Sequence, residues 1–100
     1  MADDVRIVLG EHAVDDLRRA RDHYAAIDPA LCDDFALVVD AVLNRVRTFP
    51  HGAPPVDGFP GLRRARMRRF PYGVFYRDMD GTMTVLRVLH NVRDTVQHLP

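Results

Sequence analysis

Residues 62–90 have the sequence LRRARMRRFPYGVFYRDMDGTMTVLRVLH, which predicts three successive β-strands. β-branched and aromatic residues are frequent in this stretch, and turn-forming residues divide it into three runs. Asp80-Gly81 is a typical two-residue hairpin turn. Strands joined by short turns pair antiparallel, so we expect a small antiparallel sheet. Its expected strands are Leu62–Phe70, Gly73–Met79 and Thr82–His90.

Arginines are concentrated in the first of these strands. The strand's side chains alternate, so Arg64, Arg66 and Arg68 are expected on one face and Ala65 and Met67 on the core face. Like charges on one face of a strand repel each other. The row therefore predicts an anionic partner, which could be phosphate, nucleic acid or an acidic protein segment; a merely solvated strand face is the alternative. The full set is Arg63, Arg64, Arg66, Arg68 and Arg69.

The first half of the chain predicts a short strand at Val5–Leu9 followed by two helices. Asp28-Pro29 separates the helices, because Asp is a good N-cap and Pro is tolerated at the first helical position. Pro50 ends the second helix at Phe49, and the Pro- and Gly-rich segment His51–Gly61 is expected to be a loop. The expected apolar stripes are Ala13, Leu17, Ala20, Tyr24 and Ile27 in the first helix, and Leu31, Phe35, Val38, Val42, Val46 and Phe49 in the second.

These elements predict an α+β fold of order β-αα-βββ. We expect the helical hairpin to pack on one face of a small, mainly antiparallel sheet and the other face to be open. The acidic residues of the helices are expected to lie in solvent. They are Asp15, Asp16, Asp22, Asp33, Asp34 and Asp40.

Composition indicates one domain over residues 1–100 with a dipolar charge distribution. All fourteen basic residues are arginine, and the formal net charge is zero. Residues 1–50 hold six Arg against ten acidic residues, whereas residues 51–100 hold eight against four, giving −4 and +4. Cys32 is the single cysteine, so no disulfide can form within the chain. The sequence shows no signal peptide or membrane anchor, and we expect a cytoplasmic protein.

The ordered motifs of this chain resemble those of the RelE/ParE superfamily of toxin–antitoxin toxins, over nearly the whole length. The resemblance is carried by Ala13-x-x-Asp16-Leu17 with Tyr24, Phe49-Pro50 with Gly52, Gly61-Leu62-Arg63-Arg64, Phe70-Pro71-Tyr72, Phe75-Tyr76-Arg77, Val85–His90 and Arg93-Asp94. The resemblance implies one of two activities. RelE-like members cut messenger RNA on the ribosome, whereas ParE-like members poison DNA gyrase. Both are held inactive by an antitoxin, so a hetero-oligomer with a ParD-like or related antitoxin is expected.

Two departures favour the ParE-like branch. The basic pair of cleaving relatives corresponds to Arg64 and Arg66, and their C-terminal arginine to Arg93. However, the arginine that follows their strand tyrosine corresponds to Gly73, and their late tyrosine falls near Leu99. We therefore expect a gyrase-binding toxin with no catalytic residues. The alternatives are a ribosome-dependent endoribonuclease and a non-toxic binding module of the same fold.

Several residues have more than one interpretation. His90 could act as a general acid or base in the endoribonuclease alternative, with Arg64, Arg66 and Arg93, or could simply form a hydrogen bond. Arg87 lies between apolar neighbours and should reach solvent or pair with an acid. Both Arg87 and Arg93 join the five strand arginines as candidates for binding the target or the antitoxin. The aromatic residues Tyr72, Phe75 and Tyr76 are expected in the core rather than on nucleic-acid bases. The scattered histidines predict no metal site, and no cofactor is expected.

Overall fold

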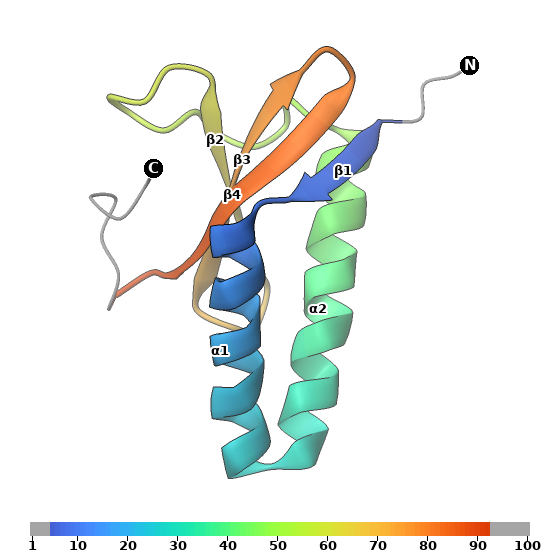
Figure 1. The fold of residues 1–100 in the computed structure, drawn as a ribbon, viewed down its shortest axis with the longest axis vertical. Coiled ribbons are helices and arrows are strands. Elements are labelled where there is room, and N and C mark those ends of the chain that lie inside the picture. The colour runs from blue at the N-terminus through green and yellow to red at the C-terminus, as the bar shows by residue number, and fades with distance from the viewer. Residues whose placement is uncertain (1–4, 93–100) are drawn as a thin grey trace.

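The computed structural model describes residues 5–92, and its elements follow the predicted order (Figure 1). The hairpin between the last two strands is confirmed: Asp80 and Gly81 have φ angles of 51° and 78°, as its turn requires. The elements are β1 (Arg6–Leu9), α1 (Glu11–Ile27), α2 (Pro29–Thr48), β2 (Leu62–Arg66), β3 (Tyr72–Met79) and β4 (Thr82–His90).

The strands form a single four-stranded sheet in the order β1-β4-β3-β2. β2, β3 and β4 pair antiparallel, and β1 joins β4 in parallel. The sheet is therefore mainly antiparallel, as expected, and β1 and β2 form its two edges. The position of β2 at an edge leaves one of its sides without a neighbouring strand.

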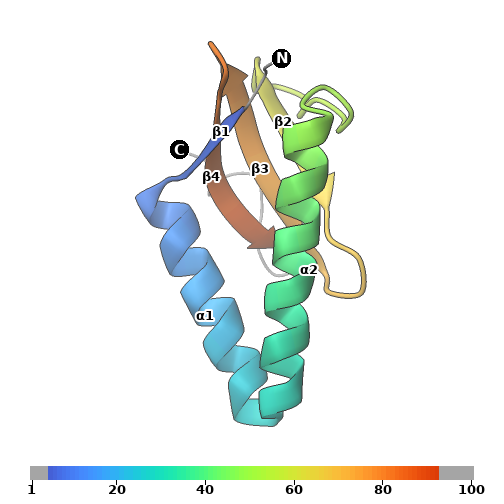
Figure 2. The ribbon, with the colours of Figure 1, turned by 90° about the vertical axis from the view of Figure 1, so that its right-hand side faces the viewer.

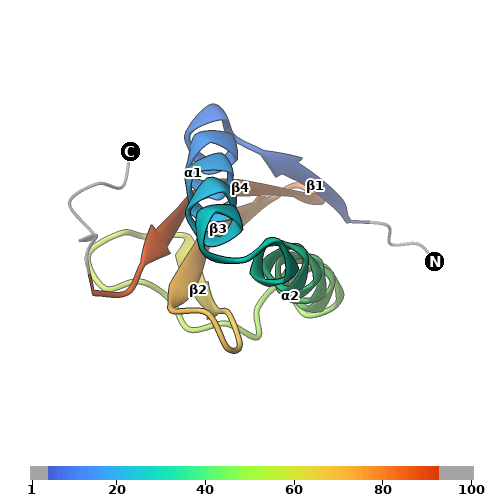
Figure 3. The same cartoon turned by 90° about the horizontal axis from the view of Figure 1, so that it is seen from below.

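The two helices lie on the same face of the sheet and meet at Asp28 (Figures 2 and 3). The amide of Asp28 donates to the carbonyl of Tyr24 at 2.9 Å, which closes α1. Its side chain accepts a hydrogen bond from the amide of Ala30 at 3.0 Å, which caps α2. The predicted N-cap is thus confirmed, and one residue ends the first helix and begins the second.

The main core lies between the helices and the sheet. An aromatic group fills its centre, with the rings of Tyr24, Phe35, Phe70 and Tyr72 in mutual contact. Tyr76 is fully buried nearby, and its hydroxyl donates to the carbonyl of Pro50 at 2.7 Å. The expectation that Tyr72 and Tyr76 belong to the core is confirmed, and these rings are not available to stack on bases.

The opposite face of the sheet is partly covered, so the expectation that this face is open was wrong. A second apolar cluster joins Leu62, Phe75 and Leu89 from the three antiparallel strands. Val56 and Phe59 of the loop pack against it. The loop can fold over because it makes backbone hydrogen bonds along the edge of β2.

The strand predicted over Leu62–Phe70 was too long, because β2 ends at Arg66. Arg69 has a φ of 72°, a left-handed conformation that interrupts a strand. The amide of Met67 donates to the carbonyl of Tyr72 at 3.0 Å and closes the turn. This turn directs Phe70 into the core and leaves Arg68 outside the strand, so the row on the strand face consists of Arg64 and Arg66 only.

Three further expectations for the helices were wrong. Ile27 and Phe49, at the ends of the two apolar stripes, are 62% and 65% exposed. They lie beyond the area that the sheet and the opposite helix cover, and α2 itself ends at Thr48. Asp16 was expected in solvent but is buried, because an arginine of β4 is placed against it.

Candidate functional site

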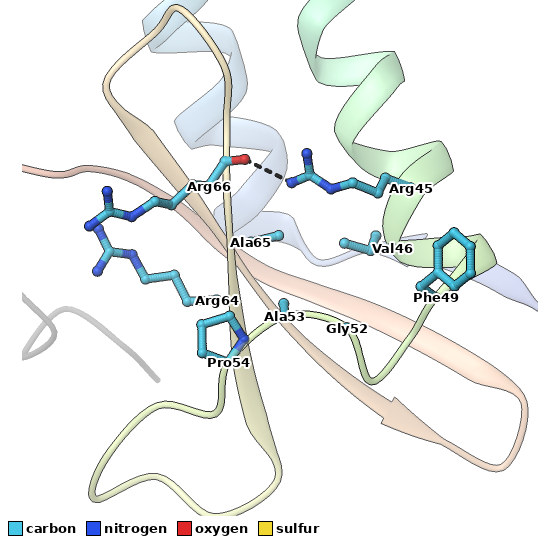
Figure 4. A pocket seen from close by; sticks show the side chains of 9 residues that line it. All are labelled: Arg45, Val46, Phe49, Gly52, Ala53, Pro54, Arg64, Ala65 and Arg66. Atoms are coloured by element: carbon cyan, nitrogen blue, oxygen red, sulfur yellow. Dashed lines mark hydrogen bonds between the residues drawn. The ribbon is translucent and has the colours of Figure 1, made fainter.

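Arg64 and Arg66 place two guanidinium groups next to each other on the side of β2 that faces away from α2 (Figure 4). Arg64 extends across β3, where its guanidinium carbon lies 5.8 Å from the centre of the Phe75 ring. Its Nη2 donates to the Asn91 side-chain oxygen at 2.6 Å. The Nε of Arg64 is buried, and no hydrogen-bond partner for it is found within residues 5–92. The side chain is therefore held in place by an aromatic ring and a neutral amide.

Gly73 provides the space that this arrangement needs. A Cβ atom at position 73 would lie 2.8 Å from the Nε of Arg64 and 3.3 Å from its Cγ. Any larger residue would force the Arg64 side chain to move. Gly73 thus allows Arg64 to lie flat on the sheet.

Neutral acceptors also hold the other arginines around β2. Arg63 donates to the carbonyls of His51 and Ala53, at 3.3 and 2.6 Å. Arg45 of α2 donates to the carbonyl of Arg66 at 2.8 Å. Within residues 5–92, none of Arg45, Arg63, Arg64 and Arg66 forms an ion pair with a carboxylate. These contacts fix the guanidinium groups of Arg45, Arg63 and Arg64 but leave their charges unneutralised.

Arg69 and Arg87 differ from this group, because each has an acidic partner. Arg69 forms an ion pair with Asp34 of α2 at 3.0 Å. Arg87 donates to Asp16 through Nε and Nη2, at 2.7 and 2.9 Å. Of the two alternatives expected for Arg87, reaching solvent or pairing with an acid, the second is confirmed. This arginine binds the helical layer to the sheet.

Asp16 accepts hydrogen bonds from three residues in addition to being buried. The amide of Val88 donates to it at 2.9 Å and Arg19 at 3.0 Å. Burial raises the pKa of the Asp16 carboxyl, but the hydrogen bonds from Arg87 and Val88, the charge of Arg87 and the Arg19 hydrogen bond outweigh burial and hold the pKa below its ordinary value. Asp16 is therefore ionised at neutral pH.

His90 does not join Arg64 and Arg66. Its ring contacts Tyr72 on the helix-covered face, with 5.3 Å between ring centres, and its Nδ1 accepts from the amide of Val92 at 3.1 Å. The neighbouring residue Leu89 belongs to the cluster on the opposite face, as strand alternation requires. The structure therefore places the candidate acid–base residue and the two arginines on opposite faces of the sheet.

The remaining candidates occupy other positions. Arg68 is exposed in the turn after β2, while Arg93 and Leu99 lie outside the described residues. Within residues 5–92, no cluster of three or more histidine, cysteine or acidic side chains is positioned to hold a metal ion. None of the helices in that range is long and apolar enough to cross a membrane.

A groove of about 530 Å³ lies between the end of α2, the loop and the outer edge of β2. Its lining combines apolar and cationic residues (Figure 4). Sequence reasoning missed this groove, although Phe49 before Pro50 and the apolar loop after it gave a signal: an aromatic residue at a helix end next to a loop that cannot form regular structure. The lining residues are Arg45, Val46, Phe49, Gly52, Ala53, Pro54, Arg64, Ala65 and Arg66.

The fold is similar to that of a solved structure described as the chromosomal ParDE TA system from P. aeruginosa. The TM-score is 0.77 at 19% sequence identity, and the match covers 89% of this chain and 98% of that one. The two chains therefore share a fold, a helical hairpin on one face of a four-stranded sheet. No curated protein matches the sequence.

The family can be stated more narrowly. The family described as "ParE toxin of type II toxin-antitoxin system, parDE" matches residues 7–95. The chain belongs to this family, and the resemblance found in its sequence is confirmed.

Proposed function

We propose that this chain arrests bacterial growth by binding DNA gyrase in the cytoplasm, and that a ParD-like antitoxin encoded beside it prevents this by forming a complex with it. Membership of the ParE family over residues 7–95 is the observation that carries the proposal. The unneutralised arginines around β2 provide a surface suited to acidic partners.

The positions of the candidate catalytic residues support binding rather than RNA cleavage. A cleaving site needs a group that moves a proton close to cations that stabilise the scissile phosphate. Here His90 and the pair Arg64 and Arg66 are on opposite faces of the sheet, and Gly73 supplies no cation. Loss of one such electrostatic contact typically reduces a rate by about 10²–10³.

Induced expression tests the toxin proposal in cells. We expect the chain alone, at verified soluble levels, to halt growth or cause filamentation with a DNA-damage response. Co-expression of the neighbouring antitoxin should restore growth. Normal growth of cells that contain the soluble chain would contradict toxicity and favour a non-toxic binding module.

Purified components identify the target. We expect the chain to inhibit DNA supercoiling by gyrase in a dose-dependent manner, and to leave messenger RNA intact on programmed ribosomes. Uninhibited gyrase combined with discrete cuts in the decoding site would overturn the proposal and establish the endoribonuclease alternative.

A further inference from the structure

The outer edge of β2 has two free backbone groups between hydrogen bonds that are already made. The amide of Arg64 donates to Pro54 at 3.0 Å, and the carbonyl of Leu62 accepts from Val56 at 2.8 Å. At the other end, the carbonyl of Arg66 accepts from Arg45. The remaining groups that point away from β3 are the carbonyl of Arg64 and the amide of Arg66. No hydrogen bond to either is found in the described part of the chain.

These two groups fit one short extended segment, because they lie on either side of Ala65 and point away from β3. The loop already pairs with β2 in this way: Pro55 faces Arg63, and its neighbours bond to the Leu62 carbonyl and the Arg64 amide. At Arg64 the amide is occupied, and at Arg66 the carbonyl is occupied. An extended segment facing Ala65 can donate to the Arg64 carbonyl and accept from the Arg66 amide.

The side chains around this edge set the preferred sequence of such a segment. Its residue opposite Ala65 points the same way as Ala65, toward Val46 and the exposed ring of Phe49 (Figure 4). The residues before and after it point to the other face, where Arg64 and Arg66 carry unneutralised guanidinium groups. An apolar residue between two acidic residues matches both faces.

We propose that the groove at the edge of β2 binds an extended acidic segment of the antitoxin, added to this edge as a short strand, with an acidic–apolar–acidic pattern facing residues 64–66. The identity of the partner rests on the proposed function, whereas the chemistry of the segment rests on the groove. Nucleic acid fits less well, because the groove has an apolar floor and offers backbone groups that pair with a peptide. The acidic residues Asp33 and Asp40, which are exposed on α2, would also repel phosphates.

Amide NMR with a short synthetic peptide of alternating glutamate and leucine tests the groove without the antitoxin or gyrase. We expect titration to about 1 mM peptide to shift the amide signals of β2 and to slow hydrogen exchange at the Arg66 amide. A peptide with serine in place of leucine loses the apolar contacts, and one with lysine in place of glutamate loses the charge complementarity. Each should bind at least about tenfold more weakly.

Variants of the chain locate the contacts. Arg66→Pro removes the free amide at a position where an edge strand tolerates proline, and Arg66→Gln keeps it. We expect the proline variant to lose more affinity than the glutamine variant. Arg64→Glu with Arg66→Glu should weaken binding by about tenfold or more. The matched control Arg6→Glu with Arg21→Glu changes the same charge at exposed positions outside the groove and should stay within about twofold.

The peptide result is independent of the gyrase result. The titration uses the unsubstituted chain, so it does not depend on whether the variants fold. Unchanged β2 signals and unchanged exchange of the Arg66 amide at the highest peptide concentration would overturn the proposal. Equal binding of the lysine peptide would also overturn it. Binding of a mixed-sequence single-stranded RNA, in place of the acidic peptide, at residues 64–66 would assign the surface to nucleic acid instead.

Discussion

Arg64 and Arg87 lie on the two strands that flank β3, and both face the same residue, Phe75, in the strand register. Arg87 meets the buried carboxylate of Asp16, with its own side chain 16% exposed and that of Asp16 4% exposed. Arg64 meets the neutral side chain of Asn91. The comparison shows that similar positions in the sheet register do not determine whether an arginine has a carboxylate partner. The charge of Arg87 is balanced within the fold, whereas no carboxylate within residues 5–92 balances the charge of Arg64.

Removal of the buried carboxylate should have the largest effect on stability. Asp16→Ala removes the carboxylate to which Arg87 and the Val88 amide donate, and breaking a buried pair of this kind typically costs about 3–5 kcal/mol of unfolding free energy. Arg64→Ala should cost about 1 kcal/mol or less, because it removes one neutral-acceptor hydrogen bond and some packing. Urea unfolding of both variants measures the difference. Equal losses would show that the two arginines do not differ as described.

The pH dependence of stability should reveal the same carboxylate. The pKa of Asp16 is lower in the folded chain than the ordinary value of about 3.9. Its contribution is therefore fully present above the unfolded pKa and is lost as pH falls through the lower, folded pKa. We expect the difference in unfolding free energy between the unsubstituted chain and Asp16→Ala to be constant from neutral pH to about 5 and to shrink below about 4. A difference that stays unchanged down to acid unfolding would contradict this assignment.

Substitution at Gly73 should have a smaller effect that depends on Arg64. Gly73→Ala places a Cβ against the Arg64 side chain, which must move and lose its hydrogen bond to Asn91. We expect a loss of about 0.5–1.5 kcal/mol, and a much smaller loss when Arg64 is already alanine. A double-mutant cycle by urea unfolding measures this coupling. An equal loss in both backgrounds would show that Gly73 is not needed to accommodate Arg64.

Sequence patterns predicted the order of the elements correctly, but not the end of β2 or the covering of the second sheet face. The Asp28 cap and the Asp80-Gly81 turn are local features, and local chemistry was enough to place them. The end of β2 depends on Phe70, which turns inward to contact Tyr24 and Phe35, and alternation along the strand cannot reveal such a tertiary contact. The partner of Arg87 could be anticipated as an acid, but the choice of Asp16 required the packing of α1 on β4.

Phe49 before Pro50 gave a signal for one part of the groove, but the whole groove was not predictable, for a similar reason. It is formed by the end of α2, the loop and a strand edge, which are separated in the sequence. The expected arginine row correctly included Arg64 and Arg66, yet Arg45 came from a helix whose composition is mainly acidic and apolar. Only the fold brings these three cations to one edge of the sheet.

The association rate of the antitoxin tests most directly the claim that the β2 arginines are kept for a partner, although their effect on stability should be the smallest. Stopped-flow association would be measured from low to high salt for the unsubstituted chain, for Arg64→Glu with Arg66→Glu, and for the control Arg6→Glu with Arg21→Glu. Steering by opposite charges speeds association and is screened by salt. We predict that the β2 variant associates more slowly and with a weaker salt dependence, while its unfolding free energy changes by about 1 kcal/mol or less. Identical rates and salt dependence in the β2 variant and the unsubstituted chain would contradict the account.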